Sequence, residues 1–189
     1  MPMTRMNEGA AELNDDLVEI VDYDPIWKVR FLEEKSRLEI AFKGIAPQIK
    51  HIGSTSVPGL AAKPVIDILV AFEAALEADE LVRVLATLGY VHVPQEDRDR
   101  IFFRKGMPRT HHVHVVRAGS WTFFSHIWFR DYLVDHPSAA EEYELLKRVL
   151  AARHRSDRAT YVNGKDAMVS MILDRAAKER LIVPRDPLD

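Results

Sequence analysis

The stretch HIGSTSVPGLAAKPVIDILV, residues 51–70, decides the fold of this chain. It begins as a short strand, passes through a loop rich in Gly, Ser and Pro, and ends in a near-continuous apolar run. Such a run is typical of a strand that is buried on both faces of a sheet. Asp67 is the one ionisable residue inside it. Because an unpaired buried carboxylate is costly, Asp67 requires a metal, a cation or hydrogen-bond donors.

The loop before this run has the composition of a phosphate-binding turn. Gly53 and Ser54 follow the first strand, and twelve residues separate Ser54 from Asp67. A Gly-Ser turn that opens a helix offers free backbone N–H groups and a hydroxyl to a phosphate. Ser56 belongs to the same loop, and Lys63 stands at the mouth of the Asp67 strand. Gly53, Ser54, Ser56 and Lys63 are therefore candidate phosphate-binding residues.

Helices and further strands are expected on both sides of this region. An Asp cap followed by Pro, at Asp24-Pro25, predicts a helix that ends by Gly44. Periodicity and turn residues predict strands at 48–53, 63–72, 90–93, 100–105 and 110–116, helices at 79–88, 123–134 and 164–181, and a helix opening at Pro137 with the apolar stripe Ala139, Tyr143, Leu146 and Leu150. These elements predict an α/β (α+β) fold with a small mixed, mostly antiparallel sheet flanked by helices, and a helical C-terminal part.

Length and composition indicate one domain. The chain has 189 residues, and we expect the domain to cover 19–183 between tails at 1–18 and 184–189. Cysteine is absent, which excludes disulfides and thiolate chemistry. The net charge of −3 does not indicate a nucleic-acid or membrane surface, no stretch approaches about 18 uninterrupted apolar residues, and the start is polar. We therefore expect a cytoplasmic protein without a membrane or nucleic-acid partner.

The strand THHVHVV, residues 110–116, carries alternating histidines. Alternation places His112 and His114 on one face and the valines on the other. With Asp67 this pair offers the ligands of a transition-metal site, since imidazole suits zinc, manganese or nickel better than magnesium. The alternative is a polar network in which the histidines donate to Asp67 or to backbone carbonyls.

Basic residues gather in the expected strand at 100–105 and in the segments on either side of it. The segment DRDRIFFRKGMPR contains Arg98, Arg100, Arg104, Lys105 and Arg109. Arginine forks suit phosphate oxygens, which makes Arg104 and Arg109 candidate phosphate ligands. The alternative is a solvated hairpin edge whose charges prevent aggregation between strands.

Two levels of resemblance follow from these motifs. Ile52-Gly53-Ser54 and Asp67-Ile68 resemble the motif of nucleotidyltransferases of the DNA-polymerase-β type. The longer string GSTSVPGLAAKPVID, with YDPIW at 23–27, HHVHVV at 111–116, FRDYLVDHP at 129–137 and YVNGK at 161–165, resembles the GrpB family over about residues 20–181. The resemblance implies a nucleotidyltransferase-like fold, a place for Tyr161 and Lys165 in the cleft, and a position for His112 or His114 where the superfamily has a third carboxylate.

One departure from the motif concerns the metal. Active transferases of this type carry a second carboxylate two residues after the first, and here that position is Leu69. A two-metal site for Mg²⁺ needs several oxygen ligands, and Asp67 alone supplies too few.

Three functions are consistent with these residues. The first is a nucleotide- or phosphate-binding protein, a nucleotidyltransferase acting on a small acceptor if it is an enzyme, with Asp67 and Ser54 as catalytic residues. Asp67 would hold Mg²⁺ or another divalent metal, Gly53 and Ser54 would grip the triphosphate, and arginines or Lys165 would stabilise the leaving pyrophosphate. The second is a non-catalytic ligand-binding module linked to coenzyme A metabolism, because GrpB domains occur fused to dephospho-CoA kinase. The third is a metal-dependent hydrolase that uses Asp67, His112 and His114.

Overall fold

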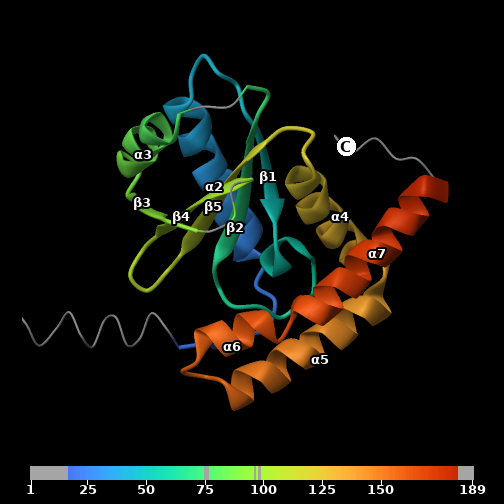
Figure 1. The fold of residues 1–189 in the computed structure, drawn as a ribbon. Helices are drawn as coiled ribbons and strands as arrows, with labels where there is room; N and C mark the ends of the chain where they lie inside the picture. Colours follow the sequence, from blue (N-terminus) through green and yellow to red (C-terminus); the bar gives the residue numbers. More distant parts are fainter. Residues whose placement is uncertain (1–16, 75–76, 96, 98, 183–189) are drawn as a thin grey trace, which may run out of the picture.

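The computed structural model describes residues 17–74, 77–95, 97 and 99–182. Arg98 and most of the two expected tails, 1–16 and 183–189, lie outside the described residues. The elements in chain order are α2 (Ile26–Ala41), β1 (Gln48–Ile52), the short 3-10 helix η1 (Ser54–Ser56), β2 (Ile66–Phe72), α3 (Ala78–Ala86), β3 (Tyr90–Val93), β4 (Arg100–Lys105), β5 (His111–Arg117), α4 (Trp121–Asp135), α5 (Pro137–Arg153), α6 (Arg158–Asn163) and α7 (Asp166–Ile182) (Figure 1).

A five-stranded sheet forms the centre of the molecule, with strand order β1-β2-β5-β4-β3. β2 and β5 pair in parallel, while the other three pairs are antiparallel. The parallel pair is joined by a crossover through α3, β3 and β4, so residues far apart in sequence become neighbours at the centre of the sheet. The expected α/β fold with a mixed, mostly antiparallel sheet is confirmed.

The two faces of the sheet have different coverings. One face carries Ile68, Val70 and Val113 and packs on α2 and α3, with Trp27 and Leu81 in the same core. The other face packs on α4 only in part, through a smaller core of buried residues that lies next to the site: Ile52, Leu69, Ala71, Val116, Phe123 and Ile127. Beyond this core the second face of the sheet is left for a cleft, which α5, α6 and α7 border (Figure 1).

The helical C-terminal part differs from its prediction in two details. The buried positions of α5 are Ala139, Tyr143, Lys147 and Ala151, spaced four apart, whereas the predicted stripe included Leu146 and Leu150. From the sequence alone, a lysine in the middle of a helix is expected to be solvated, but Lys147 is only 2% exposed. Its ammonium donates to the carbonyl of Ala61, and the N–H of Ala61 donates to Glu144 at 2.9 Å.

The short helix α6 is absent from the prediction. Its start is marked by Asp157, whose side chain accepts from the N–H of Thr160 at 3.0 Å. The N-terminal boundary also needs correction, because Val18 was assigned to the tail. Val18 is buried, its N–H donates to the carbonyl of Arg155 at 2.8 Å, and it packs with Ala151 and Tyr161. In the part of the chain that the structure describes, none of the helices has the length and apolar character needed to cross a membrane.

Candidate functional site

A carboxylate and two imidazoles meet on the open face of the sheet. Asp67 Oδ1 lies 2.9 Å from His112 Nδ1 and 3.5 Å from His114 Nε2. The three side chains offer donor atoms that all lie within 4.8 Å of one another. Both imidazoles are buried, and the Asp67 side chain is 28% exposed, so the carboxylate is the part of this cluster that faces the cleft.

Strand register explains why these residues meet. In the parallel pair, Asp67 lies opposite His112, and Leu69 lies opposite His114. Side chains two residues apart on a strand point to the same face, so the three polar groups share it with Leu69. The expectation that the histidines lie beside Asp67 is therefore met by the geometry.

Gly53 allows the loop to approach the carboxylate closely. Its φ of 71° and ψ of −175° place it in a region that only glycine adopts readily. A Cβ at this position would lie 2.5 Å from Asp67 Oδ2 and 3.0 Å from Asp67 Cβ. Glycine at position 53 is thus required both by backbone conformation and by contact with Asp67.

The surroundings of Asp67 and His114 determine the protonation state of each group. Burial alone would raise the pKa of Asp67, but hydrogen bonds and charge from His112 and His114 hold that pKa well below its usual value. Burial lowers the pKa of His114, although Asp67 opposes this. Asp67 is accordingly a carboxylate, and His114 a neutral imidazole, at neutral pH.

Arg100 determines which nitrogen of His114 carries the proton. Its Nη1 lies 3.4 Å from His114 Nδ1. A guanidinium can only donate, so Nδ1 accepts and the proton of the neutral ring is on Nε2, which faces Asp67. Arg100 is also held by Gln95 and lies near Asp97, with Nη2 to Gln95 Oε1 at 2.5 Å and Nε to Asp97 Oδ2 at 3.5 Å.

The cluster has the donor set of a transition-metal site. Ligand atoms at about 2.0–2.2 Å from one ion are roughly 3.0–3.5 Å apart, close to the separations from Asp67 to the two histidines. One carboxylate and two imidazoles suit zinc, manganese or iron better than magnesium. For His114 Nε2 to bind an ion, its proton must move to Nδ1, which requires Arg100 to release that nitrogen.

A strongly basic cavity opens in front of Asp67. It has a volume of about 410 Å³, and five basic side chains line it: Lys63, Arg100, Arg109, Arg158 and Lys165. Ser54 from η1 and the ring of Tyr161 complete the wall. Among the described lining residues, Asp67 is the one carboxylate.

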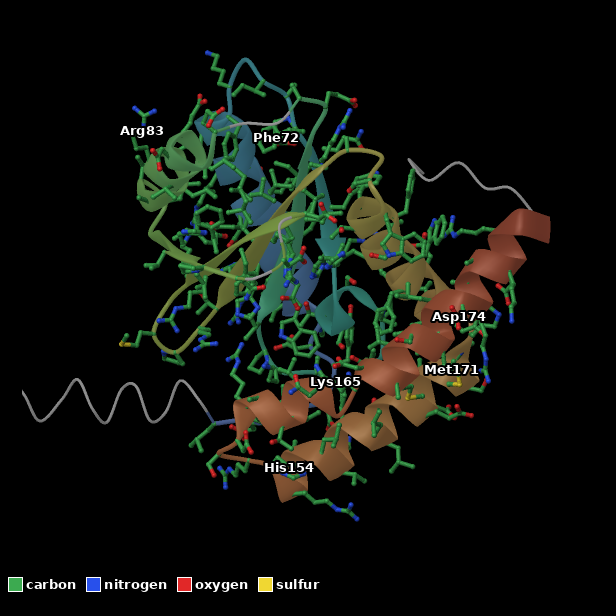
Figure 2. All side chains as sticks on the ribbon, in the orientation of Figure 1. Phe72, Arg83, His154, Lys165, Met171 and Asp174 are labelled. Carbon is green, nitrogen blue, oxygen red and sulfur yellow. The ribbon has the colours of Figure 1, made fainter. Side chains whose placement is uncertain are left out.

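The two lysines of this cavity flank one aromatic ring. Lys63 Nζ lies 5.5 Å and Lys165 Nζ 4.6 Å from the ring centre of Tyr161. Burial, with the charges of Arg158 and Lys165, lowers the pKa of Lys63 to about 8. Burial also lowers the pKa of Lys165, while Asp67 opposes the shift. Figure 2 shows Lys165 at the junction of α6 and α7, on the side that faces the strands.

Five of the eight expected phosphate-binding residues line this cavity, whereas Gly53, Ser56 and Arg104 do not. Ser56 Oγ donates to the carbonyl of Gly53 at 2.5 Å, so this hydroxyl shapes the loop. Arg104 lies opposite His112 on β4, but it is not among the residues that line the basic cavity. Lys105, another member of the basic segment, points to the opposite face and pairs with the buried Glu34 at 2.7 Å.

Two of the basic residues that line the cavity, Arg100 and Arg158, were not among the site residues chosen from the sequence. Arg100 lies in the basic segment, and its strand parity with Arg104 was a signal that pointed to the same face. Arg158 begins α6, and the cap at Asp157 was the signal for that helix.

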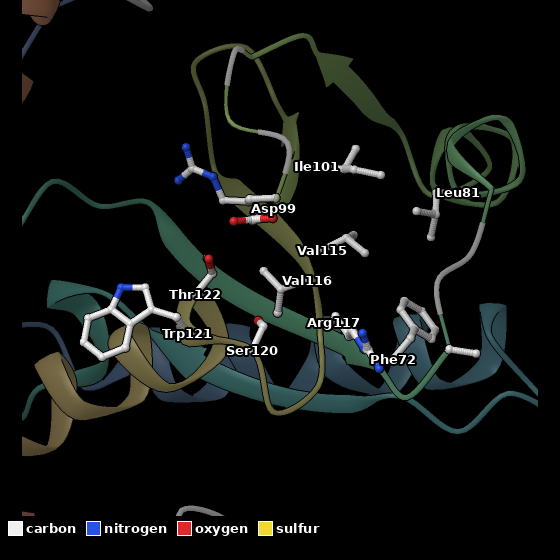
Figure 3. Close-up of a pocket in the computed structure, with 12 residues that line it drawn as sticks. Phe72, Leu81, Asp99, Ile101, Val115, Val116, Arg117, Ser120, Trp121 and Thr122 are labelled. Atoms are coloured by element: carbon white, nitrogen blue, oxygen red, sulfur yellow. The ribbon is translucent and has the colours of Figure 1, made fainter.

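A different kind of cavity lies at the far end of the sheet. It has a volume of about 350 Å³ and mainly apolar walls that include Phe72, Leu81 and Val115, with Trp121 at its edge (Figure 3). Arg100 lines this cavity as well as the basic one. Its apolar walls do not suit phosphate, which distinguishes it from the cavity at Asp67.

Comparison with known proteins shows the family to which this chain belongs. The family model described as GrpB protein matches residues 17–175. The chain belongs to the GrpB family. A UPF0157 protein of Pseudomonas aeruginosa is 40% identical over 169 residues, which cover 86% of this chain and 69% of that protein. The UPF0157 protein YqkA of Bacillus subtilis is 40% identical over 166 residues, which cover 85% of this chain. This chain spans about half (48%) of the length of that relative.

Solved structures agree on the fold. The crystal structure of GrpB from Enterococcus faecalis has a TM-score of 0.80 at 36% identity, covering 86% of this chain and 99% of that one. The GLD-2/RNP-8 complex has a TM-score of 0.56 at 12% identity, covering 96% and 74%. The Cid1 poly(U) polymerase has a TM-score of 0.50 at 12% identity, covering 85% and 53%. The last two likenesses show the fold alone, which is nucleotidyltransferase-like.

A further relative has a named activity. Dephospho-CoA kinase of Mycolicibacterium paratuberculosis is 29% identical over 177 residues, which cover 79% of this chain and 43% of that protein. The GrpB-like segment is thus less than half of that kinase.

Proposed function

We propose that this GrpB protein binds the phosphate groups of a nucleotide in the basic cavity and transfers a nucleotidyl group to a small acceptor. The observation that carries the proposal is the convergence of five basic side chains on one cavity, beside the Gly53-Ser54 loop and the Asp67 carboxylate. Guanidinium and ammonium groups that meet in a partly buried cavity stabilise several phosphate charges at once.

The roles of the residues follow from their positions. Lys63, Arg109, Arg158 and Lys165 would bind the outer phosphates and stabilise the pyrophosphate that leaves. Ser54, at the start of η1, would contact the phosphate next to Asp67. Asp67 with His112 and His114 would hold a divalent metal, which neutralises charge on the phosphate that reacts.

Arg100 links the anion and the metal in this proposal. Its Nε is buried with no hydrogen-bond partner among the described residues and lies 3.5 Å from Asp97 Oδ2, and its Nη1 donates to His114 Nδ1. A phosphate that draws the guanidinium into the cavity frees His114 to bind the metal through Nε2. We therefore expect metal to bind weakly to the free protein and more tightly when triphosphate is present.

A binding experiment tests the phosphate site. Calorimetry with tripolyphosphate should give binding that Lys63→Ala and Arg158→Ala each weaken by about tenfold or more, equivalent to about 1.4 kcal/mol. Arg83→Ala is the matched control, because it also removes one positive charge but lies on α3, on the other side of the molecule from Lys165 (Figure 2). Equal weakening by all three variants would show that net charge, and not the cavity, attracts the anion.

One observation favours a non-catalytic module as a second candidate. Leu69, at the position of the second carboxylate, is fully buried in the small core under α4, so the two-carboxylate arrangement is absent there. The relation to dephospho-CoA kinase suggests coenzyme A precursors as ligands for such a module. Tripolyphosphate binding without turnover of any labelled nucleoside triphosphate, with Mg²⁺, Mn²⁺ or Zn²⁺ present, would favour this candidate.

The Asp67, His112 and His114 cluster favours a metal-dependent hydrolase as a third candidate. Such an enzyme would hold its metal without nucleotide. Tight Zn²⁺ or Mn²⁺ binding to the free protein, lost in His114→Ala, would select it over the transferase.

A further inference from the structure

A second cavity meets the basic one at Asp67. It has a volume of about 260 Å³ and shares four wall residues with the basic cavity: Ser54, Asp67, His114 and Lys165. The remaining walls come from the end of β1, from α4, from α5 and from α7. The carboxylate therefore stands between two separate spaces.

The two spaces differ in chemistry. Arginine is absent from the described walls of the second cavity, and Lys165 is its one basic side chain. Ile52, Phe129, Val169 and Leu173 form an apolar side, whereas Ser125, His126 and Tyr143 add polar atoms next to Asp67. A multiply charged phosphate chain suits the first cavity, and a small, mostly apolar molecule with one polar group suits the second.

His126 presents a hydrogen-bond acceptor to this space. Its Nδ1 lies 2.7 Å from the carbonyl oxygen of Thr122, one turn earlier on α4. A carbonyl can only accept, so Nδ1 carries the proton of the neutral ring and Nε2 keeps a lone pair. Because Nδ1 faces the helix backbone, the Nε2 edge points away from it. The ring lies beside that of His114, with 5.3 Å between centroids.

We infer that the second cavity is the acceptor site of the transfer reaction and takes a small molecule with a hydroxyl group on an apolar body. This inference rests on the proposed nucleotidyl transfer. The apolar body lies against Phe129, Val169 and Leu173, and the hydroxyl lies between Asp67 and His126, where it donates to His126 Nε2. The hydroxyl oxygen then faces the phosphate that Ser54 holds, beside the Asp67, His112 and His114 side chains that would hold a metal.

The arrangement gives an in-line displacement. The hydroxyl oxygen forms a bond to the α-phosphorus while the bond from that phosphorus to the bridging oxygen of the β-phosphate breaks. Pyrophosphate leaves with the bonding electrons into the basic cavity, and the hydroxyl proton passes to His126 Nε2 and on to solvent. The attacking and leaving oxygens thus occupy opposite cavities, as an in-line reaction requires.

Benzyl alcohol, a hydroxyl on an apolar ring, is a suitable probe in nuclear magnetic resonance titrations. We expect it to shift the His126 ring signals and the Leu173 methyl signals, with and without saturating tripolyphosphate. Val169→Phe should abolish these shifts by filling the second cavity, and tripolyphosphate affinity should stay within about twofold. Leu173→Phe serves the same purpose if Val169→Phe does not fold.

A matched variant fills the other cavity. Val162→Phe, on α6, lies at the wall of the basic cavity only, so it should weaken tripolyphosphate and leave the benzyl alcohol shifts intact. His126→Phe should remove the preference for benzyl alcohol over toluene while keeping an apolar wall.

The outcomes separate the two proposals. Three results would overturn the acceptor site while tripolyphosphate binding still supports the proposed function. They are competition between benzyl alcohol and tripolyphosphate, probe shifts that persist in Val169→Phe and Leu173→Phe, and no shift of His126 at saturating probe. Failure of tripolyphosphate to bind the wild-type protein would instead overturn the proposed function, and the acceptor site with it.

Discussion

Gly53→Ala should damage both the stability of the protein and its phosphate site. The alanine must adopt a φ near 71° and a ψ near −175°, a conformation that costs about 1–3 kcal/mol for a residue with a side chain. The new Cβ would also lie 2.5 Å from Asp67 Oδ2, so the carboxylate must move from His112. Loss of a hydrogen bond to a charged group costs about 1.5–3 kcal/mol more.

Thermal unfolding and calorimetry measure these effects together. A loss of this size should lower Tm by roughly 5–20 °C in a protein of this length, and tripolyphosphate and metal should bind more weakly. Gly59→Ala is the control, because Gly59 has a φ of 81° but a Cβ there would meet nothing within 4 Å. It should lose only the backbone contribution and keep both ligands.

A double-mutant cycle isolates the contact with the carboxylate. In an Asp67→Ala background the 2.5 Å contact no longer exists and the 3.0 Å contact with Cβ remains, so the further loss caused by Gly53→Ala should fall toward that of Gly59→Ala. If Gly53→Ala were no more destabilising than Gly59→Ala and bound both ligands normally, the argument that Gly53 makes room for Asp67 would be wrong.

Four further changes test the electrostatics and packing of the site. Since burial lowers the pKa of Lys63 to about 8, its charge is present below that pH, so tripolyphosphate affinity should fall as pH rises through 8, and Lys63→Arg should move the fall to higher pH in parallel calorimetric titrations. Burial lowers the pKa of Lys147 to about 7, so above that pH the unfolded state binds more protons than the folded state. The free energy of unfolding should therefore rise between pH 7 and 10, and urea titrations of Lys147→Met should lack this rise. Leu69→Asp should lower the free energy of unfolding by about 3–5 kcal/mol, because the new charge would lie in the core under α4, and Mg²⁺ should not restore this stability. Leu69→Met should lower the free energy of unfolding by less than about 1.5 kcal/mol. Arg100→Gln should raise the affinity of the free protein for Zn²⁺, since His114 Nδ1 could then donate to the amide oxygen and leave Nε2 for the metal; unchanged Zn²⁺ affinity by calorimetry would contradict the proposed link between Arg100 and the metal.

The sequence predicted the centre of the fold well because its signals there are local. The apolar run around Asp67, the cap at Asp24 and the alternation in THHVHVV each specify one element, and strand parity placed His112 and His114 on a common face. The motif resemblance supplied Tyr161 and Lys165, which no local pattern linked to the cleft.

What the sequence could not show depends on contacts between distant segments. Lys147 is a buried lysine because its ammonium reaches a carbonyl 86 positions earlier in the chain. Arg100 could be distinguished from Arg104 only in the structure, where its guanidinium reaches from its place opposite Val116 to His114. The second cavity exists because α4, α5 and α7 meet over the end of β1, and helix packing of that kind leaves no periodic signal.

The double attachment of Ala61 to α5 has a consequence for the rates of ligand exchange. Glu144 and Lys147 hold the N–H and the carbonyl of the same residue, so the loop that leads to Lys63 is tied to the helices on the other side of the cleft. A large hinge opening between sheet and helices would break both bonds and expose a buried ammonium. Ligands should therefore enter a site that is already shaped, through side-chain movements on the nanosecond scale, with association limited by diffusion and attraction of charge rather than by domain opening.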